Sequence, residues 1–240
     1  MAIGCSDGTG PGGDQGRIGL ALATAGSSQN SAALAAPESH TLGGTTLVLT
    51  RVQLVLREIE LERAESSTDC GDDTPVGAED DCEEFETGPV LLDLPLNGAI
   101  EQLITIDADS GTFDELEFEV HKPEDDAEHA AFLSQHPDFE GVSIRVEGTW
   151  NGTPFVFTTD LDVEQEMDLA PPLQILGGGA STQVTLLVDL RRWFLNGEGT
   201  AFVDPATGNK GGSNESLVKE NIKQSFEAFE DHDSDGEPDA

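Results

Sequence analysis

The stretch that decides the fold is 142-VSIRVEGTWNGTPFVFTTDLDV-163. Apolar and polar residues alternate on both sides of Asn151-Gly152, and Asn-Gly between two alternating runs is the strongest short signal for a β-hairpin. We therefore expect strands at 142–150 and 155–163, joined by a tight turn. This hairpin indicates a β protein.

The same period of two continues on both sides of the hairpin. Further strands are predicted at 17–24, 45–63, 90–94, 100–106, 113–121 and 184–190, whereas 27–44, rich in Ser, Ala and Gly, is predicted to be a connection. Eight or so short strands with turn residues between them predict a mainly β fold, an antiparallel β-sandwich. In the 45–63 segment the apolar residues change face near Arg57, which predicts either a bulge or a strand that passes from one sheet to the other. Either one leaves Glu58, Glu60 and Glu62 as an acidic stripe.

Near the C-terminus the period changes to that of an amphipathic helix. Apolar residues recur at helical spacing at Val218, Ile222, Phe226 and Phe229, and Glu215 lies four residues before Lys219. The helix is expected to dock on the sandwich or on a partner chain. The predicted organisation is a flexible tether at 1–15, a β-sandwich domain at 16–195, and a turn-rich segment, helix and Asp-rich loop at 196–240.

Charge limits the partners of the chain. Its 240 residues contain 48 Asp and Glu against 11 Lys and Arg, a formal net charge of -37. Such a surface repels nucleic acid and anionic lipid, so divalent cations are the expected partners. High salt and a calcium-rich extracellular setting both offset the repulsion among the carboxylates, and the composition fits either one.

The cysteines point to export. Cys70 and Cys82 bracket an acidic loop, and a disulfide there would contribute about 3 kcal/mol in an oxidising compartment; free thiols are the alternative. The segment Ala2-Ile3-Gly4-Cys5 resembles the lipobox of bacterial lipoproteins. The resemblance implies lipidation of Cys5 and an extracytoplasmic location at the cell surface. Only four residues precede Cys5, fewer than a leader needs, and a chance cysteine is the alternative. No apolar run approaches the length of a membrane span, so membrane contact is expected only through such an anchor.

Alternate acids at the C-terminus suggest a calcium site. Asp231, Asp233, Asp235, Glu237 and Asp239 surround Gly236, and the segment resembles the loops of EF-hand, dockerin and thrombospondin type 3 families. That resemblance implies Ca²⁺ as cofactor, bound weakly at roughly 0.1–1 mM because the acid of position twelve is missing. An acidic disordered tail is the alternative.

Other candidate residues indicate no reaction. His121, His129 and His136 lack the four-residue spacing of a helical metal site and are predicted at the surface, and no nucleophile elbow, phosphate loop or dinucleotide fingerprint occurs. The large aromatic and basic residues are predicted to be structural. These are Trp150, Trp193 and Phe194 in the core, and Arg191 and Arg192 neutralising acids in a buried pair.

The segments 16–24, 51–62, 90–96 and 109–113 resemble an uncharacterised β-sandwich domain family of bacterial and archaeal surface lipoproteins, over residues 16–195. The resemblance implies a sandwich fold and a surface location, and it transfers no catalytic residue. We therefore expect an exported, surface-tethered, non-catalytic cation-binding protein with an adhesion or envelope-structural role. A subunit of an extracellular filament or layer is the alternative, and a carbohydrate-binding module that recognises surface glycans is a weaker one.

Overall fold

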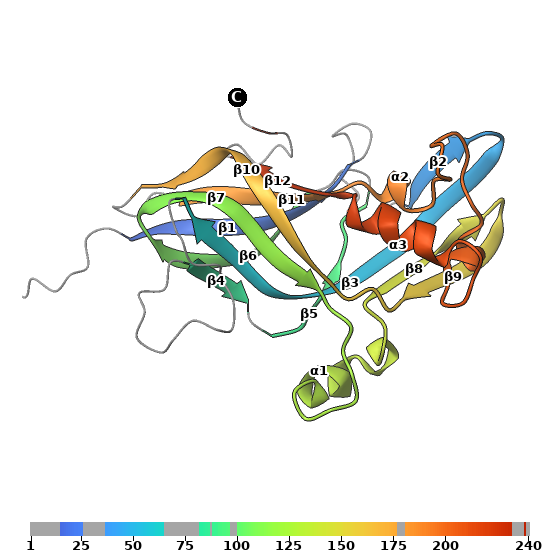
Figure 1. Ribbon diagram of the computed structural model, residues 1–240, viewed down its shortest axis with the longest axis horizontal. Coiled ribbons are helices and arrows are strands. Elements are labelled where there is room, and N and C mark those ends of the chain that lie inside the picture. Colours follow the sequence, from blue (N-terminus) through green and yellow to red (C-terminus); the bar gives the residue numbers. More distant parts are fainter. Residues whose placement is uncertain are drawn as a thin grey trace, which may run out of the picture.

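Two β-sheets packed face to face make up the body of the protein. The computed structural model describes residues 15–25, 37–64, 82–86, 88–96, 100–176, 181–231 and 238 (Figure 1). One sheet has four strands and the other has eight, and the apolar faces of the two sheets meet. The chain is therefore a β-sandwich, as the sequence predicts. Within these residues, no helix combines the length and the apolarity needed to span a bilayer.

The smaller sheet brings together both ends of the chain. Its order is β12 (Phe226–Glu230), β11 (Ser181–Val188), β1 (Gln15–Thr24) and β6 (Ile100–Asp109). β1 pairs with β6 in antiparallel fashion and with β11 in parallel fashion. The sheet is thus mixed, which differs from the purely antiparallel arrangement predicted from the strand pattern. Leu20 and Leu22, on the central strand β1, are fully buried.

The larger sheet is organised around one long strand, β3. Five strands follow one another in the order β10-β7-β3-β8-β9, and three more pair with β3 beside this path. The bounds of these strands are β2 Glu38–Leu42, β3 Thr45–Arg63, β4 Cys82–Glu86, β5 Val90–Asp93, β7 Gly111–Val120, β8 Ile144–Trp150, β9 Thr153–Thr159 and β10 Val163–Ile175. β2 corrects one prediction, because it lies within the 27–44 segment expected to be a connection.

The predicted change of face in β3 is a β-bulge. The pairing of β3 with β7 shifts register between Arg57 and Glu60, and Glu58 has a φ of 50°. Leu54 and Leu56 are buried before the bulge, and Ile59 and Leu61 are buried after it. One extra residue therefore keeps apolar side chains in the core along the whole strand.

The predicted β-hairpin around Asn151-Gly152 is confirmed. Strands β8 and β9 pair from Ile144↔Thr159 to Trp150↔Thr153. Asn151 and Gly152 have φ angles of 49° and 82°, the positive values that a type I′ turn requires at both central positions. The Asn151 side chain also accepts a hydrogen bond of 2.9 Å from the amide of Thr46, which ties the turn to β3.

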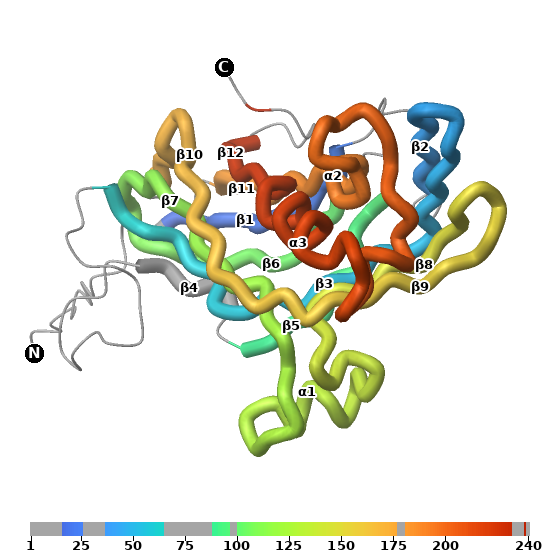
Figure 2. Tube along the Cα trace, turned by 45° about the vertical axis from the view of Figure 1, so that its right-hand side comes forward, coloured from blue at the N-terminus to red at the C-terminus, as the bar shows by residue number. Residues whose placement is uncertain are grey.

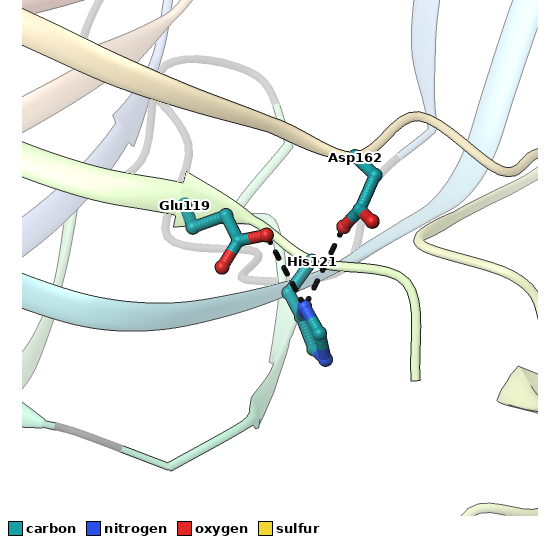
Figure 3. Close-up of side chains that lie close together, drawn as sticks. All are labelled: Glu119, His121 and Asp162. Carbon is teal, nitrogen blue, oxygen red and sulfur yellow. Dashed lines mark hydrogen bonds and ion pairs between the residues drawn. The ribbon is translucent and has the colours of Figure 1, made fainter. Parts of the chain in front are cut away.

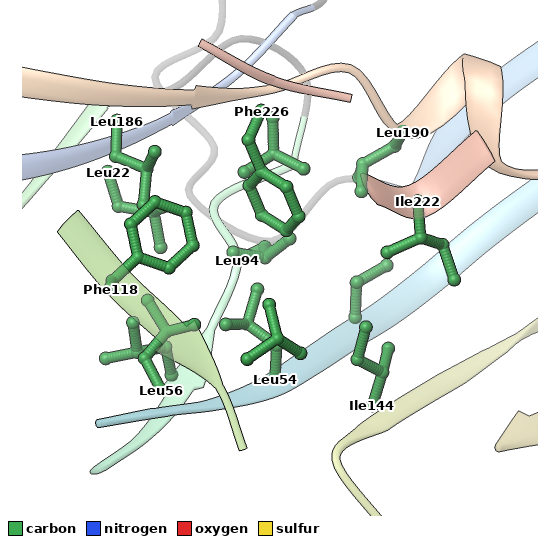
Figure 4. Packing of buried hydrophobic residues seen from close by; sticks show 14 of the residues in the cluster. Leu22, Leu54, Leu56, Leu94, Phe118, Ile144, Leu186, Leu190, Ile222 and Phe226 are labelled. Carbon is green, nitrogen blue, oxygen red and sulfur yellow. The ribbon is translucent and has the colours of Figure 1, made fainter. Parts of the chain in front are cut away.

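The core lies between the two sheets and is made of large aliphatic and aromatic side chains. Leu22 and Leu186 of the smaller sheet face Leu56 and Phe118 of the larger one (Figure 4). Phe118 meets Phe226 edge to face, with ring centroids 5.3 Å apart. Such pairs contribute roughly 0.5–1.5 kcal/mol beyond the area they bury.

The C-terminal region corrects the predicted helix. α3 (Glu215–Lys223) buries Val218 and Ile222 and contains the predicted ion pair, with Lys219 Nζ 2.9 Å from Glu215 Oε1. The helix ends before Phe226. Residues 226–230 instead form β12, which pairs with β11. The backbone of β11 gains a hydrogen-bonded neighbour in this way, and that tertiary gain outweighs the helical spacing of the two phenylalanines.

Four short helices fill connections between the described strands: α1 (Ala130–Gln135), α2 (Leu190–Trp193) and the 3₁₀ turns η1 (Pro137–Phe139) and η2 (Pro205–Gly208). Trp193 and Phe194 are fully buried, as predicted, and Trp150 packs partly buried against the core. Arg191 and Arg192 are exposed, so the expected buried pair is wrong. They are the two middle residues of α2, whereas Leu190 and Trp193 at its ends are buried.

One segment leaves the sandwich altogether. Residues 122–142, here called the α1 excursion, connect β7 to β8 and carry α1 and the 3₁₀ turn η1 (Pro137–Phe139). Both views show the excursion projecting away from the two sheets (Figures 1 and 2). His121, at the end of β7, lies where the excursion begins.

Candidate metal centre

The outer face of the larger sheet carries rows of acidic residues. Strand alternation turns Leu116 and Phe118 of β7 into the core and leaves the glutamates between them on the opposite face. Register then places acids side by side across β3, β7 and β10. The two rows are Glu62–Glu115–Asp168 and Glu60–Glu117–Glu166.

These rows have a direct electrostatic consequence. Partial burial, a hydrogen bond with Glu164 and the surrounding negative charges raise the pKa of Glu117 from 4.5 to about 8. Burial and neighbouring carboxylates also raise the pKa of Glu115. Like charges directly opposed across strands destabilise a sheet, so this face favours protons or other cations.

The next row contains a basic residue, Arg57 of β3, instead of a third acid at that position. Arg57 lies opposite Glu119, and its Nε donates a short hydrogen bond to Glu119 Oε2. Its other nitrogens lie 3.3 Å from Glu58 Oε1 and 3.5 Å from Glu128 Oε1. Burial alone would raise the pKa of Glu119, but hydrogen bonds from His121 and Arg57 outweigh it and lower that pKa to about 2. Glu119 is therefore ionised under all ordinary conditions.

His121 brings a nitrogen donor to this ionised carboxylate. Its backbone N–H donates to the carbonyl oxygen of Val55 at 3.0 Å, which fixes the residue at the end of β7. Its Nδ1 lies 3.4 Å from Glu119 Oε1 and 3.5 Å from Asp162 Oδ1 (Figure 3). Asp162 comes from the connection just before β10, and its Oδ1 accepts the Lys122 amide at 3.0 Å. The ligand atoms of the three residues all lie within 4.8 Å of one another.

The separations suit a metal ion better than they suit hydrogen bonds. Strong charge-assisted N–H···O contacts are about 2.7–2.9 Å long, shorter than either His121 contact. Two ligands at about 2.0–2.2 Å from a tetrahedral ion lie about 3.3–3.6 Å apart. The nitrogen-to-oxygen distances of 3.4 and 3.5 Å fall within that interval. A metal ion could thus bind His121 together with either carboxylate with little movement of the imidazole. Because the three ligand atoms lie only within 4.8 Å of one another, an ion bound by all three would draw the two carboxylate oxygens closer together.

A second histidine holds the other side of the His121 ring. His121 Nε2 lies 2.9 Å from His129 Nε2, and His129 Nδ1 lies 2.9 Å from Asp126 Oδ1. If His121 Nδ1 binds a metal, then Nε2–H donates to His129, and His129 Nδ1–H donates to Asp126. Metal-bound histidines commonly have such an outer partner on the second nitrogen, because it fixes the tautomer and the orientation of the ring.

Two contacts bear on the state of His129. The backbone N–H groups of Glu128 and His129 donate to Asp126 Oδ1, and the His129 amide is the main cause of the lowered pKa of Asp126. An ionised Asp126 favours a proton on His129 Nδ1. The Glu124 amide, 3.3 Å from the same Nδ1, would favour the opposite tautomer, but the Asp126 contact is shorter and charged.

The centre is open on one side only. The His121 side chain is 6% exposed and that of Glu119 is 17% exposed, whereas that of Asp162 is 43% exposed. One imidazole and two carboxylates leave a coordination position that water or a substrate atom could occupy. A mixed nitrogen and oxygen donor set of this kind suits divalent first-row transition metal ions.

The prediction that the histidines lie at the surface is wrong. All three were predicted at the surface, but His121 and His129 are each only 5% exposed, and His136 is half-buried. The i, i+4 rule does not apply, since the contact forms where the excursion folds back on β7. One signal was available: Glu117, Glu119 and His121 continue the same period of two, so strand alternation places all three on one face.

The predicted calcium loop is mostly outside the described residues. Asp231 is fully buried and accepts a hydrogen bond of 2.9 Å from the Thr185 hydroxyl, while Asp233, Asp235, Glu237 and Asp239 are not described. The loop stays a prediction. Cys5 and Cys70 also lie outside the described residues, and Cys82 begins β4, so the predicted lipidation and the predicted disulfide stay predictions as well.

Comparison with known proteins adds little. No protein-family model matches the chain, and no curated protein matches it. Among solved structures the chain is similar to MbnP from Methylosinus trichosporium, with 12% sequence identity and a TM-score of 0.39, over 75% of this chain and 78% of that one. A likeness this distant carries no argument about function.

Proposed function

We propose that the protein is an extracytoplasmic metal-binding β-sandwich, in which Glu119, His121 and Asp162 hold a divalent first-row transition metal ion. The observation that carries the proposal is the convergence of two carboxylate oxygens on His121 Nδ1, at 3.4 and 3.5 Å. The surrounding charge supports it, because a net charge of -37 concentrates cations at the surface.

The donor set would give selectivity among the available cations. Calcium and magnesium prefer oxygen ligands, whereas imidazole suits zinc, copper, iron and nickel. The acidic rows on the same sheet offer only carboxylates, which a transition ion and calcium could both use. His121 is therefore the residue that would distinguish the centre from the rest of the acidic surface.

We assign binding rather than catalysis to the centre. A general base works best with a pKa near the operating pH. Burial raises the pKa of Glu119, but the hydrogen bond and the charge of Arg57 lower it whether or not His121 Nδ1 carries a proton, so Glu119 stays ionised beside a metal ion. It would accept a proton poorly at neutral pH. A role in capturing or carrying the ion fits these properties better than a hydrolytic one.

Zinc titration followed by calorimetry tests the proposal. The full chain is expected to bind one equivalent of Zn²⁺ in the presence of excess Ca²⁺ and Mg²⁺. His121→Gln and Asp162→Asn each remove a ligand and should weaken binding by more than the roughly 10- to 100-fold that loss of an outer-shell partner costs.

Matched variants control for fold and charge. His136 lies in the 122–142 segment beside the centre, so His40→Gln, which changes a half-buried histidine of β2 paired with Glu38, is the better matched histidine control. Asp93→Asn removes an exposed acid that pairs with Arg51. His40→Gln and Asp93→Asn should bind zinc as the unmodified chain does. Equal zinc affinity in the ligand variants and in these controls would reject the centre.

The other functional expectations remain proposals. Export and a surface tether are supported by the composition and by the lipobox-like segment at Cys5, and the Asp-rich C-terminus is a second, calcium-type site. Surface adhesion is compatible with a tethered, metal-binding sandwich. Subunit assembly would need the N-terminal segment or the C-terminal helix to complete the fold of a neighbouring chain, and glycan binding rests on analogy with other β-sandwiches.

A further inference from the structure

The α1 excursion leaves and rejoins the sandwich at a single point. His121 N–H donates to the Val55 carbonyl oxygen where the excursion begins, and Val55 N–H donates to the Ser143 carbonyl oxygen where it ends. A hydrogen bond of 2.8 Å from Gly141 N–H to the Pro123 carbonyl oxygen closes the neck. The excursion can therefore open locally without breaking any pairing within the two sheets.

Few apolar contacts hold the excursion down. Its buried residues Phe132 and Phe139 form a small cluster with Val55 of β3, separate from the main core, and Leu91 of β5 packs at the edge. An open pocket of about 390 Å³, lined by α1 and β5, lies beside this cluster. Regions with little buried apolar surface open at low free energy, well below global unfolding.

Polar contacts that dock the excursion involve the metal centre or its neighbours. His129 contacts the ligand His121 at 2.9 Å, and Glu128 lies 3.5 Å from Arg57, which in turn bonds to the ligand Glu119. Asp126, which orients His129, is also on the excursion. When the excursion opens, His121 loses its contact with His129, and Arg57, which bonds to Glu119, loses its contact with Glu128.

We propose that metal binding and docking of the α1 excursion are coupled, with His129 as the positioning residue that links them. The inference rests on the proposed function of the centre. A metal ion on His121 Nδ1 fixes Nε2–H toward His129 and so favours the docked state. Because coupling is reciprocal, a docked excursion strengthens metal binding by the same factor.

The size of the coupling follows from what outer-shell partners contribute. Loss of such a partner commonly weakens metal binding by about 10- to 100-fold. Saturating Zn²⁺ should therefore slow hydrogen exchange in the excursion by about 10- to 100-fold. The reporting amides are those of Leu133 and His136, which donate to the carbonyl oxygens of His129 and Phe132, both at 2.9 Å. Amides of the β8–β9 hairpin serve as the internal control.

Undocking the excursion from a distance tests the reverse direction. Phe132→Ala removes an 8% exposed ring from the small cluster without touching a ligand, and Phe202→Ala removes a 7% exposed ring that packs near β2. Phe132→Ala should weaken zinc binding by about tenfold or more, and Phe202→Ala should leave it unchanged. His129→Gln, which needs no cavity in the cluster, should weaken binding to a similar extent.

The outcomes separate the two proposals. If the unmodified chain binds no zinc, the proposed function and the coupling both fail. If zinc binds but exchange of the Leu133 and His136 amides is unchanged, the coupling alone is overturned. Zinc affinity in His129→Gln equal to that of the unmodified chain would likewise overturn it while leaving the three-ligand centre in place.

Discussion

Replacing Glu117 by Gln should stabilise the protein, and more so as the pH rises. Glu117 faces Glu60 and Glu166 across the sheet, and burial, a hydrogen bond with Glu164 and these charges raise its pKa from 4.5 to about 8. The folded state thus holds a proton that the unfolded chain loses near pH 4.5. The contribution of Glu117 to the free energy of unfolding is fully present below about pH 4.5. It is lost progressively as the pH rises toward about 8, because the folded state must then give up its proton.

The magnitude is limited by solvent. A rise in pKa from 4.5 to about 8 would correspond to about 5 kcal/mol for a fully buried group. Glu117 is only half-buried, and solvent screening reduces the expected effect to about 1–2 kcal/mol. Gln is close in shape to the protonated acid, so Glu117→Gln should match the unmodified chain at about pH 5 and exceed its stability by that amount at about pH 9.

Urea unfolding at about pH 5, 7 and 9 measures the difference. Glu227→Gln is the matched control, since it neutralises an exposed strand glutamate on β12 of the other sheet. A gain from Glu117→Gln that stays constant between about pH 5 and 9, or that Glu227→Gln reproduces, would refute the assignment of the effect to the acidic rows.

Three further predictions concern the strand packing and the undescribed segments. Gly148→Ala should destabilise the protein by about 3 kcal/mol in urea unfolding, because the added methyl would overlap a backbone carbonyl oxygen of β3; an unchanged midpoint would contradict this. Cys70 and Cys82 should be disulfide-bonded in protein from its native compartment, and mass spectrometry that finds both alkylated without reduction would exclude the bond. Millimolar Ca²⁺ should raise the melting temperature more than Mg²⁺ at equal ionic strength, and Asp233→Asn/Asp235→Asn should abolish that difference if the C-terminal loop is the site.

Local sequence signals predict the strands and turns of this fold better than they predict which strands pair with one another. Turn chemistry predicts the Asn151-Gly152 turn correctly. The phase of the apolar residues locates the irregularity near Arg57 but allows either a bulge or a passage between sheets, and the structure has the bulge. A period of two tells which face of a strand is buried, but it does not tell which strand lies beside it. The parallel pairing of β1 with β11 therefore had no local signal.

The C-terminal error has a similar cause. Val218, Ile222 and Phe226 have helical spacing, and α3 obeys it as far as Lys223. Beyond that point the backbone hydrogen bonds of β11 determine the conformation, and they come from a segment distant in sequence. The candidate metal centre was missed because Asp162 reaches Glu119 and His121 only through the pairing of β10 with β7, and spacing rules on one helix or strand do not cover such a contact.

The position of β1 has a consequence for how the chain folds. This first strand is the inner strand of its sheet, between β6 from the middle of the sequence and β11 from near its end. The backbone N–H and C=O groups on the two sides of β1 cannot pair with β6 and β11 until those strands have been synthesised. Until then these groups of β1 have no strand partner. Closing such long loops slows folding to roughly milliseconds to seconds. A chain truncated before β11 should therefore aggregate, and a peptide with the β11 sequence should rescue it by filling the vacant place beside β1.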